Sequence, residues 1–458
     1  MQTSFSADQL RDPAIADADR VLRTCVHYGF CTATCPTYVL TRDENDSPRG
    51  RIDLIRAMLE RGGAPEPPTV HHLDRCLSCL GCQTTCAAKV DYARLIDVAR
   101  AHIESNFRRP LGDRLLRGFI ARTLPHPTRL RVALRLGGFA RPFARWLPGR
   151  LGAMAELASD RARAAPGPAA GVYAAAGERR SRVLLATGCV PSVLGGHVHA
   201  AALRVLRRHG CEVVVDADAG CCGALSLHLG REREARELAR ANIAAWAAHA
   251  GDRDAGGVDA IVVVTSGCGT TLKDYGRWPG CEAAARQGAL VRDVTEWLDA
   301  LGVRPDGSVP RYRVAYHDAC SLQHGQRVTE APRRVLSAAG FDLHEVPERH
   351  FCCGSAGTFH LLQPELSRTL GKRKGGHVDA VGADIAAAGN LGCIVQINRH
   401  AATPIVHTVE LVDWATGGPR PEALAGMALR APRTEAVPPA HTDHPISPPA
   451  AGGDVGVW

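Results

Sequence analysis

Apolar residues recur at helical spacing in the first quarter of the chain and predict a helical N-terminal region. Leu95, Ile96, Ala99 and Ile103 fall on one side of a helix, because residues three and four positions apart share a helix face. The same reasoning predicts helices at residues 1–22, 50–61 and 91–106. Turn-rich and Pro-rich connections separate these helices, so this region has no predicted strand.

The pattern changes at Arg182, where short apolar runs begin to alternate with helical segments. The predicted strands cover residues 182–186, 211–216, 261–264, 314–316 and 341–346, and the predicted helices cover 200–209 and 331–339. Such alternation is typical of α/β domains.

The α/β region repeats its cysteine pattern, which indicates a duplication. Cys189 and Cys221 are 32 positions apart, as are Cys320 and Cys352. The two sets are Cys189, Cys221, Cys222 and Cys268 in the first copy, and Cys320, Cys352, Cys353 and Cys393 in the second. Loops at strand ends converge on one point, so we favour metal or redox chemistry over simple burial of small thiols. Whether these cysteines bind metal is left open.

A second kind of cysteine motif lies in the N-terminal region. Cys76, Cys79, Cys82 and Cys86 follow the spacing of bacterial ferredoxins, and an upstream run contains Cys25, Cys31 and Cys35. In ferredoxins with two clusters, the last cysteine of each run binds the cluster of the other run. We therefore predict one [4Fe-4S] site made by Cys35, Cys76, Cys79 and Cys82, and a second site made by Cys25, Cys31 and Cys86.

The second site lacks one cysteine, because Tyr28 stands where the upstream run should have its second ligand. The alternatives are a three-iron cluster, a cubane whose fourth iron binds hydroxide, the Tyr28 oxygen or another side chain, and an empty site. We favour a labile or three-iron cluster.

Composition narrows the class of protein. The chain has 458 residues, which predicts two or three domains, and 17 cysteines. An odd cysteine count with adjacent pairs does not resemble a secreted disulfide framework, so reduced thiolates in a cytoplasmic setting fit better. We expect neither a signal peptide nor a membrane-spanning helix. The expected location is the cytoplasm, with peripheral attachment to the inner membrane as an option.

The net charge of +8 is concentrated in one segment, residues 108–150, which contains eleven arginines and the single acid Asp113. Apolar residues between the arginines predict short amphipathic helices. The segment is either a linker packed on a neighbouring domain, a docking surface for an acidic partner, or a surface for anionic lipid. Nucleic acid is excluded because no binding motif accompanies the charge. We expect a flexible boundary at 155–180 and a disordered tail at 415–458.

Five stretches together resemble a known family. They are residues 25–38, residues 76–86, Cys-Cys-Gly at 221–223, Ser-Gly-Cys-Gly at 266–269, and Cys-Cys-Gly-Ser-Ala-Gly-Thr at 352–358. They look like the iron-sulfur subunit of bacterial glycolate oxidase, which is related to subunits of anaerobic glycerol-3-phosphate dehydrogenase and heterodisulfide reductase. The resemblance covers residues 15–414, with Tyr28 and Ala87 as departures from the pattern.

The resemblance implies an α+β fold in which a helical two-cluster ferredoxin domain precedes a duplicated α/β cysteine-rich domain. The expected boundaries are 1–107 for the ferredoxin-type domain, 108–180 for the Arg-rich linker, 181–300 for the first Cys-Cys-Gly domain and 301–414 for the second. The same seven cysteines match the family's cluster ligands.

The resemblance also implies an electron-transfer subunit of glycolate oxidase. It would take electrons from an FAD-containing subunit that oxidises glycolate to glyoxylate, and pass them to a quinone-linked acceptor at the membrane. No Gly-rich dinucleotide fingerprint occurs here, so the FAD is expected on the partner. The alternatives are a subunit of a glycerol 3-phosphate or lactate dehydrogenase, a thiol-disulfide reductase of heterodisulfide-reductase type, and a binding protein without electron transfer.

Overall fold

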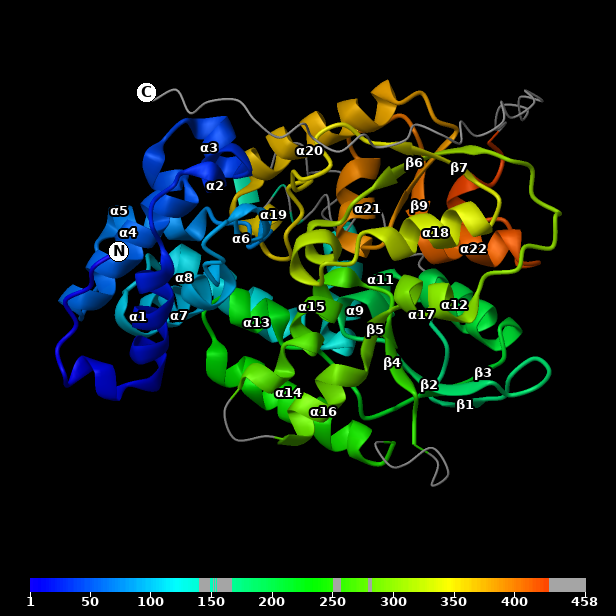
Figure 1. The fold of residues 1–458 in the computed structure, drawn as a ribbon, viewed down its shortest axis with the longest axis horizontal. Coiled ribbons are helices and arrows are strands. Elements are labelled where there is room, and N and C mark those ends of the chain that lie inside the picture. Colours follow the sequence, from blue (N-terminus) through cyan, green and yellow to red (C-terminus); the bar gives the residue numbers. More distant parts are fainter. Residues whose placement is uncertain are drawn as a thin grey trace, which may run out of the picture.

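The computed structural model describes residues 1–139, 149–150, 152, 154, 167–249, 257–278 and 282–427. A helical N-terminal region lies beside two separate sheets, each flanked by helices (Figure 1). The predicted α+β class is therefore confirmed. Among the described residues, no helix combines the length and the apolar character needed to cross a membrane.

Residues 1–107, called the ferredoxin module below, consist of short helices around one apolar core. These are η1 (Gln9–Arg11), α1 (Pro13–Thr24), α2 (Phe30–Ala33), α3 (Pro36–Thr41), η2 (Glu44–Asp46), α4 (Pro48–Arg61), α5 (Pro67–Asp74), α6 (Gly81–Thr85) and α7 (Tyr92–Asn106). The core is made of α1, α4 and α7, whose apolar faces meet through Leu22, Ile55 and Leu95. Helices predicted at 50–61 and 91–106 are present as α4 and α7.

The helix predicted from residue 1 begins only at Pro13. The Asp12 carboxylate accepts a hydrogen bond of 2.8 Å from the N–H of Ala14 and caps α1. Pro13 occupies the first helical position, where its missing N–H leaves no extra unpaired group. The chain before Asp12 therefore approaches the module without forming an α-helix.

The first cysteine-rich copy contains a five-stranded sheet in the order β1-β3-β2-β4-β5. Its strands are β1 (Gly171–Tyr173), β2 (Ser181–Ala186), β3 (Cys211–Val215), β4 (Ala260–Val263) and β5 (Val291–Asp293). Its helices are α11 (Val190–Leu194), α12 (Gly196–Arg208), α13 (Ala224–His228), α14 (Glu232–Ala247), α15 (Ser266–Lys273), η5 (Tyr275–Arg277), α16 (Glu282–Leu290) and α17 (Val294–Leu301).

The second copy contains a four-stranded parallel sheet in the order β7-β6-β8-β9, which matches β3-β2-β4-β5 of the first. Its strands are β6 (Arg313–His317), β7 (Asp342–Glu345), β8 (Ile385–Ala388) and β9 (Ile405–His407). Its helices are η6 (Ser321–Gly325), α18 (Glu330–Ala338), α19 (Phe359–Leu362), α20 (Pro364–Ala380), α21 (Leu391–Asn398), α22 (Thr408–Ala415) and η7 (Glu422–Leu424).

The two copies share one apolar core. Helices α12 and α17 of the first copy pack against α22 and α18 of the second, between the two sheets (Figure 1). Val205 on α12, Leu298 on α17 and Val412 on α22 are fully buried in this core. Because both sheets cover the same four helices, the duplicated copies form a single packed unit.

Two stretches expected to be flexible contain ordered structure. In the expected boundary at 155–180, residues 155–166 lie outside the described residues, but residues 171–173 form β1, antiparallel to β3. β1 pairs the outer edge of β3, whose backbone groups would otherwise lack partners. In the expected tail, residues 415–427 follow α22, and Leu424 is fully buried in the shared core. The expectation of disorder was wrong for these residues, and 428–458 lie outside the described part.

The arginine-rich segment forms two helices, α8 (Leu111–Thr123) and α9 (Pro127–Phe139), as predicted. Ile120 of α8 packs with Leu229 and Leu361, and Leu130 of α9 packs with Leu194 and Leu391. Each pair includes one residue from each cysteine-rich copy. The segment thus bridges both copies, as a packed linker does.

Candidate iron-sulfur sites

The Cys35 site consists of Cys35, Cys76, Cys79 and Cys82, whose side chains lie close enough together for their charges to interact. Cys35 precedes α3, Cys76 follows α5, and Cys82 lies in α6. Burial raises the pKa of the Cys82 thiol well above its usual value, and the charges of Cys79, Cys76 and Cys35 raise it further. Four converging thiolates in a dry pocket need a positive partner, so this donor set fits a cubane cluster.

The loop around Cys79 has an unusual backbone. Ser78 and Leu80, on either side of it, both have left-handed conformations, with φ of 52° and 62°. Non-glycine residues adopt this conformation at a cost, and it is typical of functional loops. The result is a tight coil that turns three sulfurs toward one centre.

Two sulfurs of the Cys35 site accept hydrogen bonds from neighbouring groups. The N–H of Ser78 and the hydroxyl of Tyr92 donate to Cys76 Sγ at 3.4 and 3.7 Å, and Arg51 Nη1 donates to Cys35 Sγ at 3.8 Å. Donors to sulfur stabilise the more reduced, more negative state of a cluster. These groups would therefore raise its reduction potential.

A buried ion-pair network supports this site. Arg51 is 1% exposed and pairs with the Asp46 carboxylate at 3.3 Å, while Arg75 and His72 contact the same carboxylate at 2.8 and 3.0 Å. Burial opposes the charge on Arg51, but the thiolates of Cys76 and Cys35 outweigh this and raise its pKa. The amino-acid sequence does not indicate this network, because a lone arginine on a helix carries no signal of burial.

The Cys25 site, formed by Cys25, Cys31 and Cys86, holds the other three predicted cysteines. Burial raises the pKa of the Cys31 thiol to about 11, the N–H of Arg49 opposes the rise, and the charges of Cys25 and Cys86 add to it. The three cysteines line a cavity of about 40 Å³ at the protein surface together with Tyr28 and Arg49.

Tyr28 is exposed rather than enclosed in this site. Its side chain is 69% exposed, and its ring stacks on that of Phe30 with centroids 6.1 Å apart. The Cys25 site therefore offers three thiolates and one tyrosine at its rim. This donor set does not fit a cubane held by four cysteines.

The cysteine-rich copies repeat each other at the atomic level. Cys189 Sγ lies 3.3 Å from Cys221 Sγ, and Cys320 Sγ lies 3.7 Å from Cys352 Sγ. Hydrogen bonds from Cys221 and Cys268 lower the pKa of Cys222. Hydrogen bonds from Cys352 and Cys393 lower the pKa of Cys353 in the same way. Each copy thus gathers its four cysteines at the carboxyl ends of its strands.

The glycine of each Cys-Cys-Gly motif is required by its geometry. Gly223 and Gly354 have φ of +88° and +87°, and a Cβ atom there would lie 2.8 Å from Ala235 O and 2.7 Å from Ser367 O. Their N–H groups donate to Cys221 Sγ and Cys352 Sγ, both at 3.4 Å. No other residue allows this close approach.

A cavity of about 220 Å³ lies between the two copies. Cysteines of both copies line it, together with Leu77 of the ferredoxin module and Leu130 and Leu134 of α9. Burial raises the pKa of Cys79 well above its usual value, and the charge of Cys320 adds to the rise. The Cys35 site therefore reaches the edge of this cavity.

The ferredoxin module is held against the second copy beside this cavity. His324 Nε2 donates to the carbonyl of His350 at 3.1 Å, so its Nδ1 accepts from the Thr84 hydroxyl at 2.7 Å. His324 lies in η6, a helix that begins directly after Cys320. Thr84 lies in α6, between the predicted ligands Cys82 and Cys86. The contact fixes α6 relative to the cysteines of the second copy.

Two domain families match this chain. The family described as "4Fe-4S dicluster domain" matches residues 21–90, and the family described as "Cysteine-rich domain" matches residues 183–273 and 314–398. The two matches to the second family coincide with the two copies.

Two bacterial iron-sulfur subunits are similar to this chain over most of its length. The glycolate oxidase iron-sulfur subunit of Escherichia coli is 37% identical over 427 residues, which cover 91% of this chain and 99% of that protein. The probable glycolate oxidase iron-sulfur subunit of Bacillus subtilis is 30% identical over 428 residues, covering 86% and 93%. Lactate utilization protein A of Oceanobacillus iheyensis is 29% identical over 248 residues, covering 51% of this chain and 96% of that protein.

Proposed function

Since this chain belongs to the family of glycolate oxidase iron-sulfur subunits, we propose that it relays electrons from an FAD-containing partner subunit towards a quinone-linked acceptor at the membrane. The partner oxidises glycolate to glyoxylate, which releases two electrons and two protons. Iron-sulfur clusters, when bound, accept and donate these electrons one at a time. The chain's own residues hold the clusters at fixed separations and tune their potentials.

The observation that carries the proposal is the continuity of the sulfur sites. Cys82 of the Cys35 site lines the same surface cavity as the three cysteines of the Cys25 site, and Cys79 lies close enough to Cys320 for their charges to interact. The Cys25 site opens at the surface, where a flavoprotein can approach, and the Cys35 site ends at the central cavity. A path that begins at the surface and ends at an internal cavity is what a relay requires.

For the cofactors, we propose a [4Fe-4S] cluster on Cys35, Cys76, Cys79 and Cys82. Cys25, Cys31 and Cys86 hold a three-iron cluster, because Tyr28 replaces the fourth thiolate and is mostly exposed. This assignment also follows the crossed ligand pattern of two-cluster ferredoxins.

Metal analysis with low-temperature EPR tests this proposal on anaerobically purified protein. We expect about seven irons per chain and the signal of an oxidised three-iron cluster, since one site holds four irons and the other three. Tyr28→Cys should raise the content to about eight and replace that signal with a second reducible cubane. Tyr28→Phe, the matched control, should leave the wild-type signal unchanged. About four irons per chain, or loss of the signal in Tyr28→Phe, would contradict the assignment.

Glycolate-dependent dye reduction by the complex with its flavoprotein tests the substrate. We expect activity with glycolate to exceed that with lactate and glycerol 3-phosphate. The similarity to lactate utilization protein A makes lactate the main competitor. Preference for either competitor would overturn this part of the proposal.

A thiol-disulfide reductase is the second candidate, and the close pairs Cys189–Cys221 and Cys320–Cys352 are the observation in its favour. It predicts reduction of small disulfides by the isolated subunit. We expect no such turnover, because the cavity is approached from the Cys35 site, which needs a flavoprotein as its electron source.

The membrane side of the proposal rests on an exposed apolar surface of α8 and α9. This α8–α9 surface consists of Leu111, Leu115, Phe119, Val132, Leu136 and Phe139. Within each helix these residues are three or four positions apart and so share one face. Phe139 is 80% exposed. Monomeric soluble proteins rarely expose such stripes without a binding role.

The charges around this surface favour an anionic lipid layer as its partner. Exposed arginines alternate with the apolar residues, at positions 108, 114, 122, 129, 131 and 135. Arginine side chains can reach lipid phosphates while their neighbours enter the interface. Leu130 and Leu134 of α9, and Leu124 in the turn before it, meanwhile line the central cavity. We therefore place the end of the relay beside α9, whose other face belongs to the proposed membrane surface.

A further inference from the structure

The second cysteine-rich copy contains a histidine that the first copy lacks. His317 ends β6 three positions before Cys320, and the equivalent position of the first copy, three before Cys189, is Ala186. The two copies otherwise match in strand order and in cysteine spacing. The difference therefore concerns the chemistry of the site and not the fold.

His317 is buried, and the polar group against its ring is a cysteine thiol. It is 1% exposed, and within the described residues its ring nitrogens have no hydrogen bond of standard geometry, but the ring contacts the thiol of Cys353. Imidazole and thiolate groups are donors that bind transition metals.

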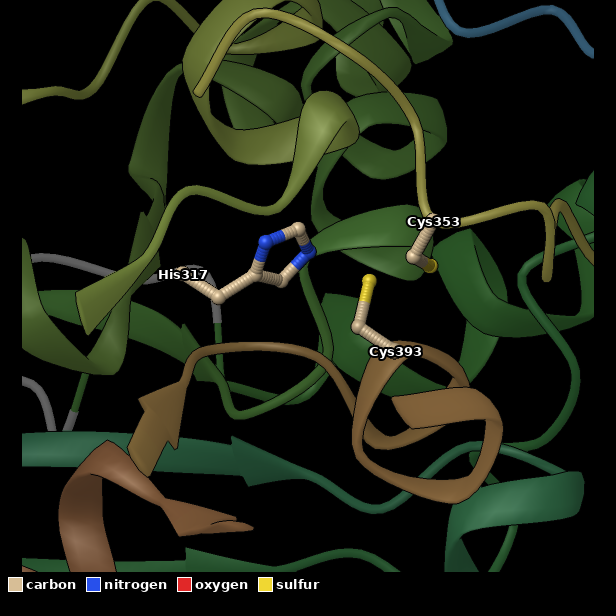
Figure 2. Close-up of side chains that lie close together, drawn as sticks. All are labelled: His317, Cys353 and Cys393. Atoms are coloured by element: carbon tan, nitrogen blue, oxygen red, sulfur yellow. The ribbon is translucent and has the colours of Figure 1, made fainter. Parts of the chain in front are cut away.

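The ring faces two cysteines. A ring nitrogen of His317 and the sulfurs of Cys353 and Cys393 lie within 4.8 Å of one another. Figure 2 shows the imidazole and the two sulfurs directed into the same small space. The three side chains come from the end of β6, the loop after β7, and α21, so the site joins three separate segments.

These distances suit one metal ion better than a cluster. A tetrahedral zinc ion with bonds of about 2.0–2.3 Å holds its donors roughly 3.3–3.8 Å apart, so small side-chain rotations would close this site. In a cubane each thiolate binds a different iron, which places the sulfurs farther apart. Nitrogen and sulfur donors together are the usual ligands of zinc.

We propose that His317, Cys353 and Cys393 bind a single Zn²⁺ ion in the second copy. A thiolate of the neighbouring Cys320–Cys352 pair completes the tetrahedron. The ion crosslinks the ends of β6 and β8 and the Cys-Cys-Gly loop, and stabilises the second copy without changing its redox state. This inference does not depend on the proposed electron relay.

Metal content and zinc K-edge X-ray absorption of the full chain test the proposal. We expect one zinc per chain, in a shell of sulfur with one nitrogen. Zinc absent from protein purified without chelators, a shell of sulfur alone, a shell without sulfur, or extra iron at this site would each overturn it.

Variants give a second test. His317→Ala should lose zinc at least tenfold more readily to a chelator, whereas His317→Cys, which supplies another zinc ligand, should retain the ion in an all-sulfur shell. His344→Ala is the matched control, because His344 is a partly exposed histidine on the adjacent β7. If His317→Ala does not fold, His317→Cys and the wild-type spectrum still decide. Equal zinc retention by His317→Ala and His344→Ala would overturn the assignment.

Discussion

Arg51 shows how one residue links the stability of the fold to the chemistry of a site. Its guanidinium is enclosed between Asp46, Thr37 and the sulfur of Cys35. A buried cation beside thiolates favours the reduced state of a cluster and also neutralises the carboxylate behind it. Removing this cation should therefore lower both the stability of the fold and the reduction potential of the Cys35 site.

We expect Arg51→Met to lower the free energy of unfolding by about 3 kcal/mol, because Asp46 would lose its most buried charge partner and keep only Arg75 and His72. The reduction potential of the Cys35 site should fall as well, which a redox titration followed by EPR measures. Arg56→Met, at a half-buried arginine of the same helix that pairs with Asp53 away from the sulfurs, is the control and should change both quantities much less. The double variant Arg51→Met with Asp46→Asn should recover part of the stability but not the potential.

The residues of the iron-sulfur sites differ in how well the sequence predicts them. Cysteine spacing is a local property, so all seven candidate ligands could be named and assigned to two groups. The position of Arg51 beside Cys35, and that of His317 beside Cys353 and Cys393, could not be predicted, because each depends on packing between segments far apart in the chain. Only the comparison of the two copies hints at His317, since the first copy has Ala186 there.

At the scale of elements, α8 and α9 are helices with two apolar faces. One face packs on both cysteine-rich copies and the other forms the α8–α9 surface. Such a segment can join the two cysteine-rich copies and bind a membrane surface at the same time.

We expect the protein to bind vesicles that contain phosphatidylglycerol and to bind pure phosphatidylcholine vesicles much more weakly. Replacing Phe119 and Phe139 by serine should weaken binding roughly tenfold or more, because each phenyl ring gains about 1.5–3 kcal/mol when fully buried. Arg131→Glu with Arg135→Glu should weaken it most at low salt. Co-sedimentation measures both, with Val172→Ser on β1 as the exposed apolar control. Unchanged binding by the serine variant would reject the surface.

The helix α22 carries a pH-dependent group at its start. Burial raises the pKa of Glu410 to about 7, while the N–H of His407, which donates to this carboxyl at 2.9 Å, opposes the rise. In the folded protein Glu410 therefore stays protonated at pH values above 4.5, the pKa of the unfolded state. The stability that the protonated carboxyl contributes is complete below about pH 4.5 and is lost as the pH rises from about 4.5 to 7.

Glu410→Gln should remove this part of the pH dependence. Relative to the variant, the wild-type protein should lose up to roughly 3 kcal/mol of unfolding free energy between pH 4.5 and 8. Denaturant unfolding of both proteins across this range measures the difference. A constant difference between the two would mean that Glu410 is ionised throughout.

Elements were predicted best where their own sequence is decisive. The runs that became β2, β3 and β4 consist mostly of buried apolar residues and form strands as predicted. β1 and the stretch around Leu424 were missed, because each is short and gains its stability from a neighbour. β1 pairs with the edge of β3, and Leu424 packs into the shared core of the two copies.

At the scale of the whole molecule, the ferredoxin module also contacts the first copy. Gly230, after α13, lies against the backbone of α7: a Cβ atom at this position would be 2.3 Å from Arg100 O. Because backbone cannot move aside as a side chain can, this contact reports directly on domain association.

Gly230→Ala should loosen the module from the first copy, and limited proteolysis should then cut the chain several times faster between residues 107 and 182. Gly302→Ala is the matched control, because Gly302 has a similar φ of +78° but no atom within 4 Å of the added Cβ. Both variants place an alanine at a positive φ, and only the alanine at 230 meets neighbouring atoms. Equal proteolysis rates for the two variants would show that the backbone around Gly230 and Arg100 can move apart without loosening the module.

The packing of α12 against α22 has a consequence for how this chain is made. The two helices are 200 residues apart, since α12 ends at residue 208 and α22 begins at 408. At about 5–20 residues per second, a ribosome adds this stretch in roughly 10–40 s. During that time β3, β4 and β5 are made and can cover the side of α12 that packs on the first sheet, but the side that packs on α22 stays uncovered. The nascent chain thus exposes this apolar side until α22 has been made, so the packing of the first copy is completed only with the second.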